Sequence, residues 1–126
     1  MANNPVGWFE IYVNDLPRAR KFYETVLGIQ LEKLDVPGDS SLNMMSFPSD
    51  MGKHGTSGAL VHIEGFPAGA NSTLVYFSSA DCSIEESRVI DAGGKIKTSK
   101  MSIGQYGFVT LVVDTEGNMF GVHSLK

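Results

Sequence analysis

One local pattern occurs twice in the chain: an apolar strand-like stretch, an acid that can cap a helix, an amphipathic segment and a glycine. The markers of the first copy are VGWFEIYV at 6–13, Asp15 and Gly28. The markers of the second copy are TLVYFS at 73–78, Asp81 and Gly93. Asp81 follows Asp15 by 66 positions, about half of the chain, which indicates a duplicated supersecondary unit. The pattern predicts helices over 16–27 and 83–92.

Each predicted helix is followed by three strand-like runs, so each half has the order βαβββ. In chain order the runs lie at 29–34, 41–47, 58–64, 95–99, 107–113 and 118–124. The segment GFPAGANS at 65–72 has the composition of a linker between the halves. We therefore predict an α+β fold in one domain over 1–126, with a first module over about 6–64 and a second over about 73–126.

Composition restricts the classes of partner. The 126 residues carry a net charge of −4, and the ten Lys and Arg are scattered, which argues against a nucleic-acid partner. No apolar run approaches the roughly 20 residues that cross a membrane, and no secretory signal is visible at the N-terminus. The single cysteine, Cys82, cannot form an internal disulfide. We expect a cytoplasmic protein that binds neither nucleic acid nor membranes.

The repeat, with Phe22 and Tyr23 on the first helix and an Asp-x-x-Gly-Asn turn at 114–118, resembles the vicinal oxygen chelate (VOC) superfamily. That superfamily contains glyoxalase I, the bleomycin and fosfomycin resistance proteins and the extradiol dioxygenases. The resemblance covers about 6–123. It implies that the paired βαβββ modules form a curved mixed sheet around a cavity, that enzymatic members hold a divalent metal there, and that the chain forms a homodimer.

The resemblance also implies where metal ligands would lie. Metal-binding members carry His seven residues before the first capping Asp, another His in the second half, and a Glu four residues after the glycine of the closing turn. The matching positions here hold Trp8, Leu74 and Gly121, with Gly58 or Leu60 for the remaining carboxylate. These side chains offer no donor to a divalent cation. We therefore predict no cofactor and no metal at the usual position, and a divalent metal only at a non-standard site.

Strand side chains alternate between faces, so residues two apart share one. If Trp8 faces the cavity, then Glu10 and Tyr12 do too. By the same alternation Tyr76 shares a face with Leu74. His62 likewise shares a face with Leu60, and His123 with Gly121. The candidate ligand-binding residues are therefore Trp8, Glu10, Tyr12, His62, Tyr76 and His123. Glu10 and His123 are the candidate catalytic residues, because a carboxylate and an imidazole can exchange protons.

Three functions fit this sequence. The first is a glyoxalase- or bleomycin-resistance-like protein that binds a small, partly apolar molecule without the usual metal. The second is an enzyme related to lactoylglutathione lyase, a lyase or isomerase, that uses Glu10 with one or both of His62 and His123. The third is a structural or interaction protein whose cavity is filled by aromatic and Met side chains, namely Trp8, Tyr12, Tyr76 and Met119.

Overall fold

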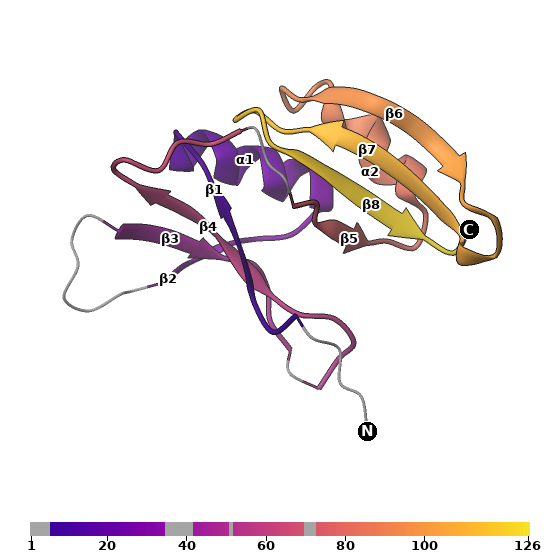
Figure 1. The fold of residues 1–126 in the computed structure, drawn as a ribbon, viewed down its shortest axis with the longest axis horizontal. Helices are drawn as coiled ribbons and strands as arrows, with labels where there is room; N and C mark the ends of the chain where they lie inside the picture. Colours follow the sequence, from indigo (N-terminus) through magenta and orange to yellow (C-terminus); the bar gives the residue numbers. More distant parts are fainter. Residues whose placement is uncertain (1–5, 35–41, 51, 70–72) are drawn as a thin grey trace.

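The computed structural model describes residues 6–34, 42–50, 52–69 and 73–126, and within these ranges each half of the chain forms one sheet and one α-helix (Figure 1). The first half contains β1 (Phe9–Tyr12), α1 (Leu16–Leu27), β2 (Glu32–Leu34), β3 (Leu42–Ser46) and β4 (Gly58–Ile63). The second half contains β5 (Tyr76–Ser78), α2 (Cys82–Val89), β6 (Lys95–Ser102), a short 3₁₀ helix (Gly104–Tyr106), β7 (Phe108–Val113) and β8 (Met119–Ser124).

The two sheets have the same topology. Their strand orders are β1-β4-β3-β2 and β5-β8-β7-β6. In each sheet the first strand of the module pairs in parallel with the last, and the other pairs are antiparallel. This confirms the predicted α+β fold with repeated βαβββ order. The described strands form two separate mixed sheets and no closed barrel.

Helix α1 has the predicted bounds because both of its ends carry the expected caps. The Asp15 carboxylate accepts the Arg18 N–H at 3.1 Å, and Pro17 occupies the first turn, where a missing N–H costs nothing. Gly28 ends the helix in the left-handed conformation, with φ of 68°, and its N–H donates to the Glu24 carbonyl oxygen.

Helix α2 begins one residue earlier than predicted and ends at Val89 rather than at 92. Asp81 caps its start by accepting the Ser83 N–H. Beyond Val89 the chain turns: the Gly93 N–H donates to the carbonyl oxygen of Ile90, only three residues back, and Gly93 has φ of 101°. No helix in the described ranges is long and apolar enough to cross a lipid bilayer.

A cluster of aromatic side chains joins the two halves. We call Phe9, Tyr23, Phe47, Phe77 and Phe120 the aromatic cluster. The Tyr23 ring centroid lies 5.1 Å from that of Phe120, and Phe77 lies 5.4 Å from Phe47. Phe9, Tyr23 and Phe47 belong to the first half of the chain. Phe77 and Phe120 belong to the second half, so the five rings form one core across the module boundary.

A buried carboxylate forms a second link between the halves. Glu116, in the turn between β7 and β8, is 6% exposed and accepts the backbone N–H groups of Asn14 and Asp15 at 3.0 and 2.9 Å. Its two oxygens also accept the Arg18 guanidinium at 2.7 and 2.9 Å. We call this set the Glu116 clamp. It fixes the segment between β1 and α1 against the second half.

The Glu116 clamp predicts a pH dependence of stability. Burial disfavours the charged form, but hydrogen bonds from Arg18, Thr115 and the Asp15 N–H outweigh it and lower the pKa of Glu116 from 4.5 to about 2. A lowered folded-state pKa contributes stability above the unfolded pKa, and this contribution disappears as the pH falls toward the folded pKa. The difference between the folded and unfolded pKa of Glu116 limits this contribution to the free energy of unfolding to about 3 kcal/mol.

We therefore expect the stability difference between the wild type and Glu116→Gln to be constant near pH 6–7 and to shrink from about pH 4.5 downward. Urea unfolding of both proteins at each pH measures this difference. Burial raises the pKa of Asp114, which has the opposite effect, but both proteins carry Asp114 and its contribution cancels. A gap that stays constant down to pH 3 would contradict the prediction.

Candidate functional site

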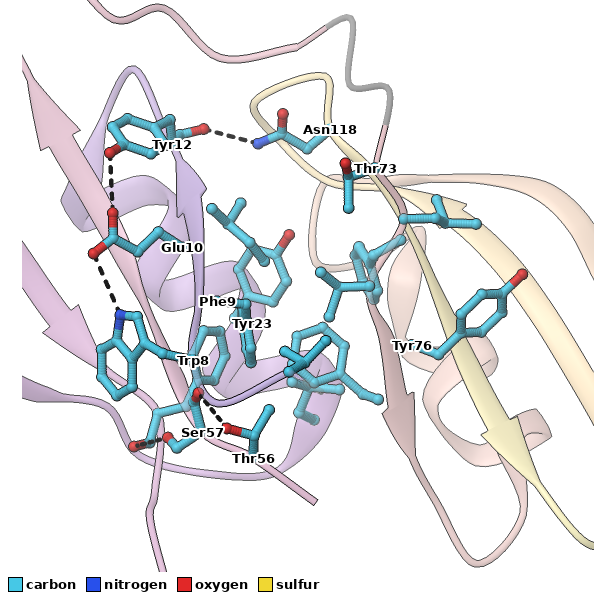
Figure 2. A pocket seen from close by; sticks show the side chains of 18 of the residues that line it. Trp8, Phe9, Glu10, Tyr12, Tyr23, Thr56, Ser57, Thr73, Tyr76 and Asn118 are labelled. Atoms are coloured by element: carbon cyan, nitrogen blue, oxygen red, sulfur yellow. Dashed lines mark hydrogen bonds between the residues drawn. The ribbon is translucent and has the colours of Figure 1, made fainter. Parts of the chain in front are cut away.

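An open cleft of about 1230 Å³ lies between β1 of the first sheet and β5 of the second. Its floor is formed by the aromatic cluster, and its walls come from both halves of the chain (Figure 2). The cleft is not filled by its own side chains, since Trp8 and Tyr76 on its walls remain 44% and 48% exposed. This openness argues against the third alternative, a cavity filled by aromatic and Met side chains.

Strand β1 presents alternate side chains to its two faces. Phe9 and Ile11 face the helices and pack against the core, and they also border the cleft. Trp8, Glu10 and Tyr12 alternate with them and line the cleft from the other face. The aromatic and polar residues that the sequence analysis grouped on this strand thus stand together on one wall, with Glu10 in the middle.

The Glu10 carboxylate is held by its two neighbours on the same face. Its Oε1 accepts the Tyr12 hydroxyl at 3.0 Å, and its Oε2 accepts the Trp8 indole N–H at 3.3 Å (Figure 2). Hydrogen bonding to Glu10, together with partial burial and the nearby negative charge, raises the pKa of Tyr12. The phenol therefore keeps its proton at neutral pH and remains a donor to Glu10.

The described residues that line the cleft include two carboxylates but no Lys or Arg. The carboxylates belong to Glu10 and Glu85, and His54 lines the cleft as well. Glu85 accepts the Ser79 hydroxyl at 2.6 Å, whereas Glu10 faces the cleft from an exposed position. None of the ion pairs within the described ranges includes Glu10.

Tyr76 occupies the position in the second half that corresponds to Glu10 in the first. It follows Glu10 by the same 66 positions that separate the two capping acids. The register agrees, because Glu10 pairs with Ala59 of β4 and Tyr76 pairs with Gly121 of β8. The Tyr76 ring lies so close over Gly121 that a Cβ atom there would collide with it.

His62 does not lie in the cleft, which corrects the sequence analysis. Gly58 and Leu60 pair with Phe9 and Ile11 on the helix side of β4, while Ala59 and Val61 face the other way. His62 shares the side of Leu60, and its Nδ1 lies 3.1 Å from the Val13 carbonyl oxygen. The sequence analysis placed Leu60 and His62 on the cleft face of β4, whereas Ala59 and Val61 face away from the helices there.

His123 lies on the same side of β8 as Gly121, but beyond the cleft. Its Nε2 is 2.7 Å from the Tyr106 carbonyl oxygen, beside the 3₁₀ helix, and it does not line the cleft. Of the six candidate ligand-binding residues, the structure brings together Trp8, Glu10, Tyr12 and Tyr76. The two candidate histidines lie elsewhere.

Several residues that line the cleft were not identified from the sequence, among them Asn118 and Phe66. Asn118 donates through Nδ2 to the Tyr12 carbonyl oxygen at 2.9 Å and accepts the Gly69 N–H at 2.8 Å, so it anchors the end of β1. Phe66 contacts the Tyr12 ring at 5.9 Å between centroids, although its segment reads as a linker. Only the Asp-x-x-Gly-Asn pattern pointed toward Asn118. Residues 70–72 of the expected linker lie outside the described ranges.

The residues at the expected metal positions do not fit a divalent cation. Trp8 and Gly121 offer no donor, and the Tyr76 ring covers Gly121. On β4 the cleft-facing position next to Glu10 is Ala59, not Gly58 or Leu60, and alanine offers no donor either. Within the described residues, no three His, Cys, Asp or Glu side chains come close enough to hold a metal ion.

Comparison with known proteins agrees with this fold. The family model of the glyoxalase/bleomycin resistance protein/dioxygenase superfamily matches residues 6–122. The anthracycline biosynthesis protein DauV from Streptomyces sp. strain C5 is 25% identical, over 96% of this chain but only 42% of its own.

Solved structures with the same fold include a variant of glyoxalase I from Zea mays, with a TM-score of 0.74 and 26% identity over 96% of this chain and 46% of that one. They also include TnmS3, an antibiotic binding protein from a Streptomyces species, with a TM-score of 0.64 and 21% identity over 98% of each chain. The present chain spans less than half of DauV and of the maize enzyme. Because the family model matches residues 6–122, nearly the whole chain, this protein belongs to the glyoxalase/bleomycin resistance protein/dioxygenase superfamily.

Proposed function

We propose that the cleft binds a small, partly apolar molecule, and that it does so without a metal at the usual position. The observation that carries this proposal is the open cleft itself, with the exposed rings of Trp8 and Tyr76 above an aromatic floor. Large aromatic side chains left exposed in a concave site mark ligand-binding surfaces. Glu10, Tyr12 and Asn118 are among the polar residues of the lining that would orient such a ligand.

The lyase or isomerase alternative receives less support from the geometry. It requires an acid–base pair, and Glu10 lies in the cleft while His62 and His123 do not. Proton transfer needs the two groups within hydrogen-bond reach of the same substrate atom. A binding role requires only the cleft and its walls.

The relatives are compatible with binding of a small molecule. TnmS3 is described as an antibiotic binding protein, and DauV belongs to anthracycline biosynthesis. The likeness to TnmS3 is one of fold, and DauV is more than twice as long as the matched region, so these descriptions do not identify a ligand for this cleft. A homodimer and a cytoplasmic location remain part of the proposal.

The binding proposal can be tested with the uncharged dye N-phenyl-1-naphthylamine, which becomes fluorescent in apolar surroundings. We expect saturable binding at one site per chain that is unchanged by EDTA or by added Zn²⁺. Tyr76→Ala should weaken the affinity about fivefold, because losing about 40 Å² of apolar contact costs about 1 kcal/mol.

Tyr106→Ala is the matched control for Tyr76→Ala. Tyr106 is also an exposed tyrosine, at 66%, but it lies outside the cleft. Its replacement should leave the affinity for the dye unchanged. The proposal fails if the dye does not saturate, if EDTA abolishes binding, or if the two alanine variants behave alike.

A further inference from the structure

We propose that the ligand of the cleft is a cation: an amphipathic molecule with an apolar body and a protonated amine or similar group that docks against Glu10. This inference rests on the proposed binding function and adds the chemical class of the ligand. It depends on three features of the site, which are the unused capacity of one carboxylate, the charges lining the cleft, and the rings beside the carboxylate.

The Glu10 carboxylate has acceptor capacity to spare. An ionised carboxylate can accept about four hydrogen bonds. In the described structure Glu10 receives one bond from Tyr12 at Oε1 and one from Trp8 at Oε2. These bonds hold the group in a fixed orientation on the cleft wall, and its remaining lone pairs are free for a donor in the cleft. An ammonium group supplies up to three N–H donors at one point.

The charges around the cleft favour a positive ligand. Glu10 and Glu85 are its acidic lining residues, and no Lys or Arg in the described ranges lines it. The chain as a whole carries a net charge of −4. A cleft lined by one sign of charge concentrates counter-ions of the other sign. An anionic ligand such as a glutathione conjugate would meet no guanidinium or ammonium group among the lining residues that the structure describes.

The rings beside Glu10 suit the same kind of ligand. Trp8 and Tyr12 flank the carboxylate on the same wall, and Tyr76 stands on the opposite side of the cleft (Figure 2). The face of an indole or phenol ring attracts a cation within about 6 Å. The aromatic floor can at the same time contact an apolar body attached to the amine. A carboxylate placed among exposed aromatic rings thus meets both ends of an amphipathic cation.

Three probes with the same apolar body separate charge from hydrophobicity: 4-tert-butylbenzylamine, 4-tert-butylbenzyl alcohol and 4-tert-butylbenzoate. Their affinities are measured at pH 7 by calorimetry. Fluorescence of Trp8, the single tryptophan of the chain, gives a second readout from the cleft wall. We expect the amine to bind about tenfold more tightly than the alcohol at low salt, and the benzoate to bind most weakly.

Two variants assign the preference to Glu10. Glu10→Gln should remove the roughly tenfold advantage of the amine over the alcohol. Glu64→Gln removes the same charge from an exposed position outside the cleft and should preserve the advantage. Raising the salt concentration should weaken binding of the amine only, because salt screens charge–charge attraction.

The outcomes distinguish the two proposals. If all three probes bind equally, or if Glu10→Gln leaves the preference for the amine intact, the cation inference is overturned and the binding function stands. If the benzoate binds most tightly, the inference is also overturned. If none of the probes binds, and the uncharged dye does not bind either, both proposals fail together.

Discussion

Replacing Glu116 by alanine is expected to lower the free energy of unfolding by about 3 kcal/mol, which is a large share of the usual stability of a small domain. The carboxylate accepts four hydrogen bonds from Asn14, Asp15 and Arg18 and a fifth from the Thr115 hydroxyl. Alanine would leave the two backbone N–H groups without this acceptor, and an unsatisfied buried donor costs about 1–3 kcal/mol. The Arg18 side chain is 52% exposed and can turn into water, so its loss adds little.

Urea unfolding at pH 7 measures this effect, and Glu64→Ala provides the control. Glu64 is an exposed glutamate directly after β4 and makes no ion pair in the described ranges. Its replacement should change the free energy of unfolding by less than about 0.5 kcal/mol. If the two variants differ by less than about 1 kcal/mol, the Glu116 clamp does not stabilise the fold as argued.

The Glu116 clamp also illustrates what the sequence could not show. The Asp-x-x-Gly-Asn pattern predicted the turn that carries Glu116, because turn chemistry is local. The partner of Glu116 at Arg18 lies 98 positions away, and no spacing in the sequence connects the two. By contrast, the helix caps at Asp15 and Asp81 were predictable, because each capping side chain contacts a residue only two or three positions away.

The cleft shows the same division between local and non-local information. On β1 the alternation of side chains placed Trp8, Glu10 and Tyr12 on one face. On β4 the same argument started from the wrong residue and put His62 in the cavity, because a one-residue error in register moves every side chain to the opposite face. The pairing of Glu10 with Ala59 fixes the register, and it is visible only when the strands are assembled.

Whether the cavity is open or filled was likewise undecided by the sequence. The same aromatic residues can fill a core or line a pocket, depending on the distance between the two sheets. In the structure the division is clear: Phe77 and Phe120 pack into the aromatic cluster, whereas Trp8 and Tyr76 remain exposed above it. The side chains that close the core thereby form the floor on which a ligand would rest.

Replacing one member of this floor should have the largest effect on stability. Phe120 is 1% exposed, and its ring lies 5.1 Å from Tyr23, 5.5 Å from Phe77 and 6.1 Å from Phe22 between centroids. Phe120→Ala removes the ring and leaves a cavity between rigid aromatic neighbours that cannot close around it. Such replacements cost about 3–5 kcal/mol, and we expect about 4 kcal/mol here, measured by urea unfolding at pH 7.

Phe66→Ala is the matched control, because Phe66 is a phenylalanine that is 58% exposed at the edge of the cleft. Its replacement should cost less than about 1 kcal/mol, since little buried surface is lost. Phe120→Ala should also weaken binding of N-phenyl-1-naphthylamine, because Phe120 forms part of the cleft floor and both halves depend on its contacts. A loss of stability below about 1.5 kcal/mol would show that the rings repack, and that the aromatic cluster does not join the two halves as a single core.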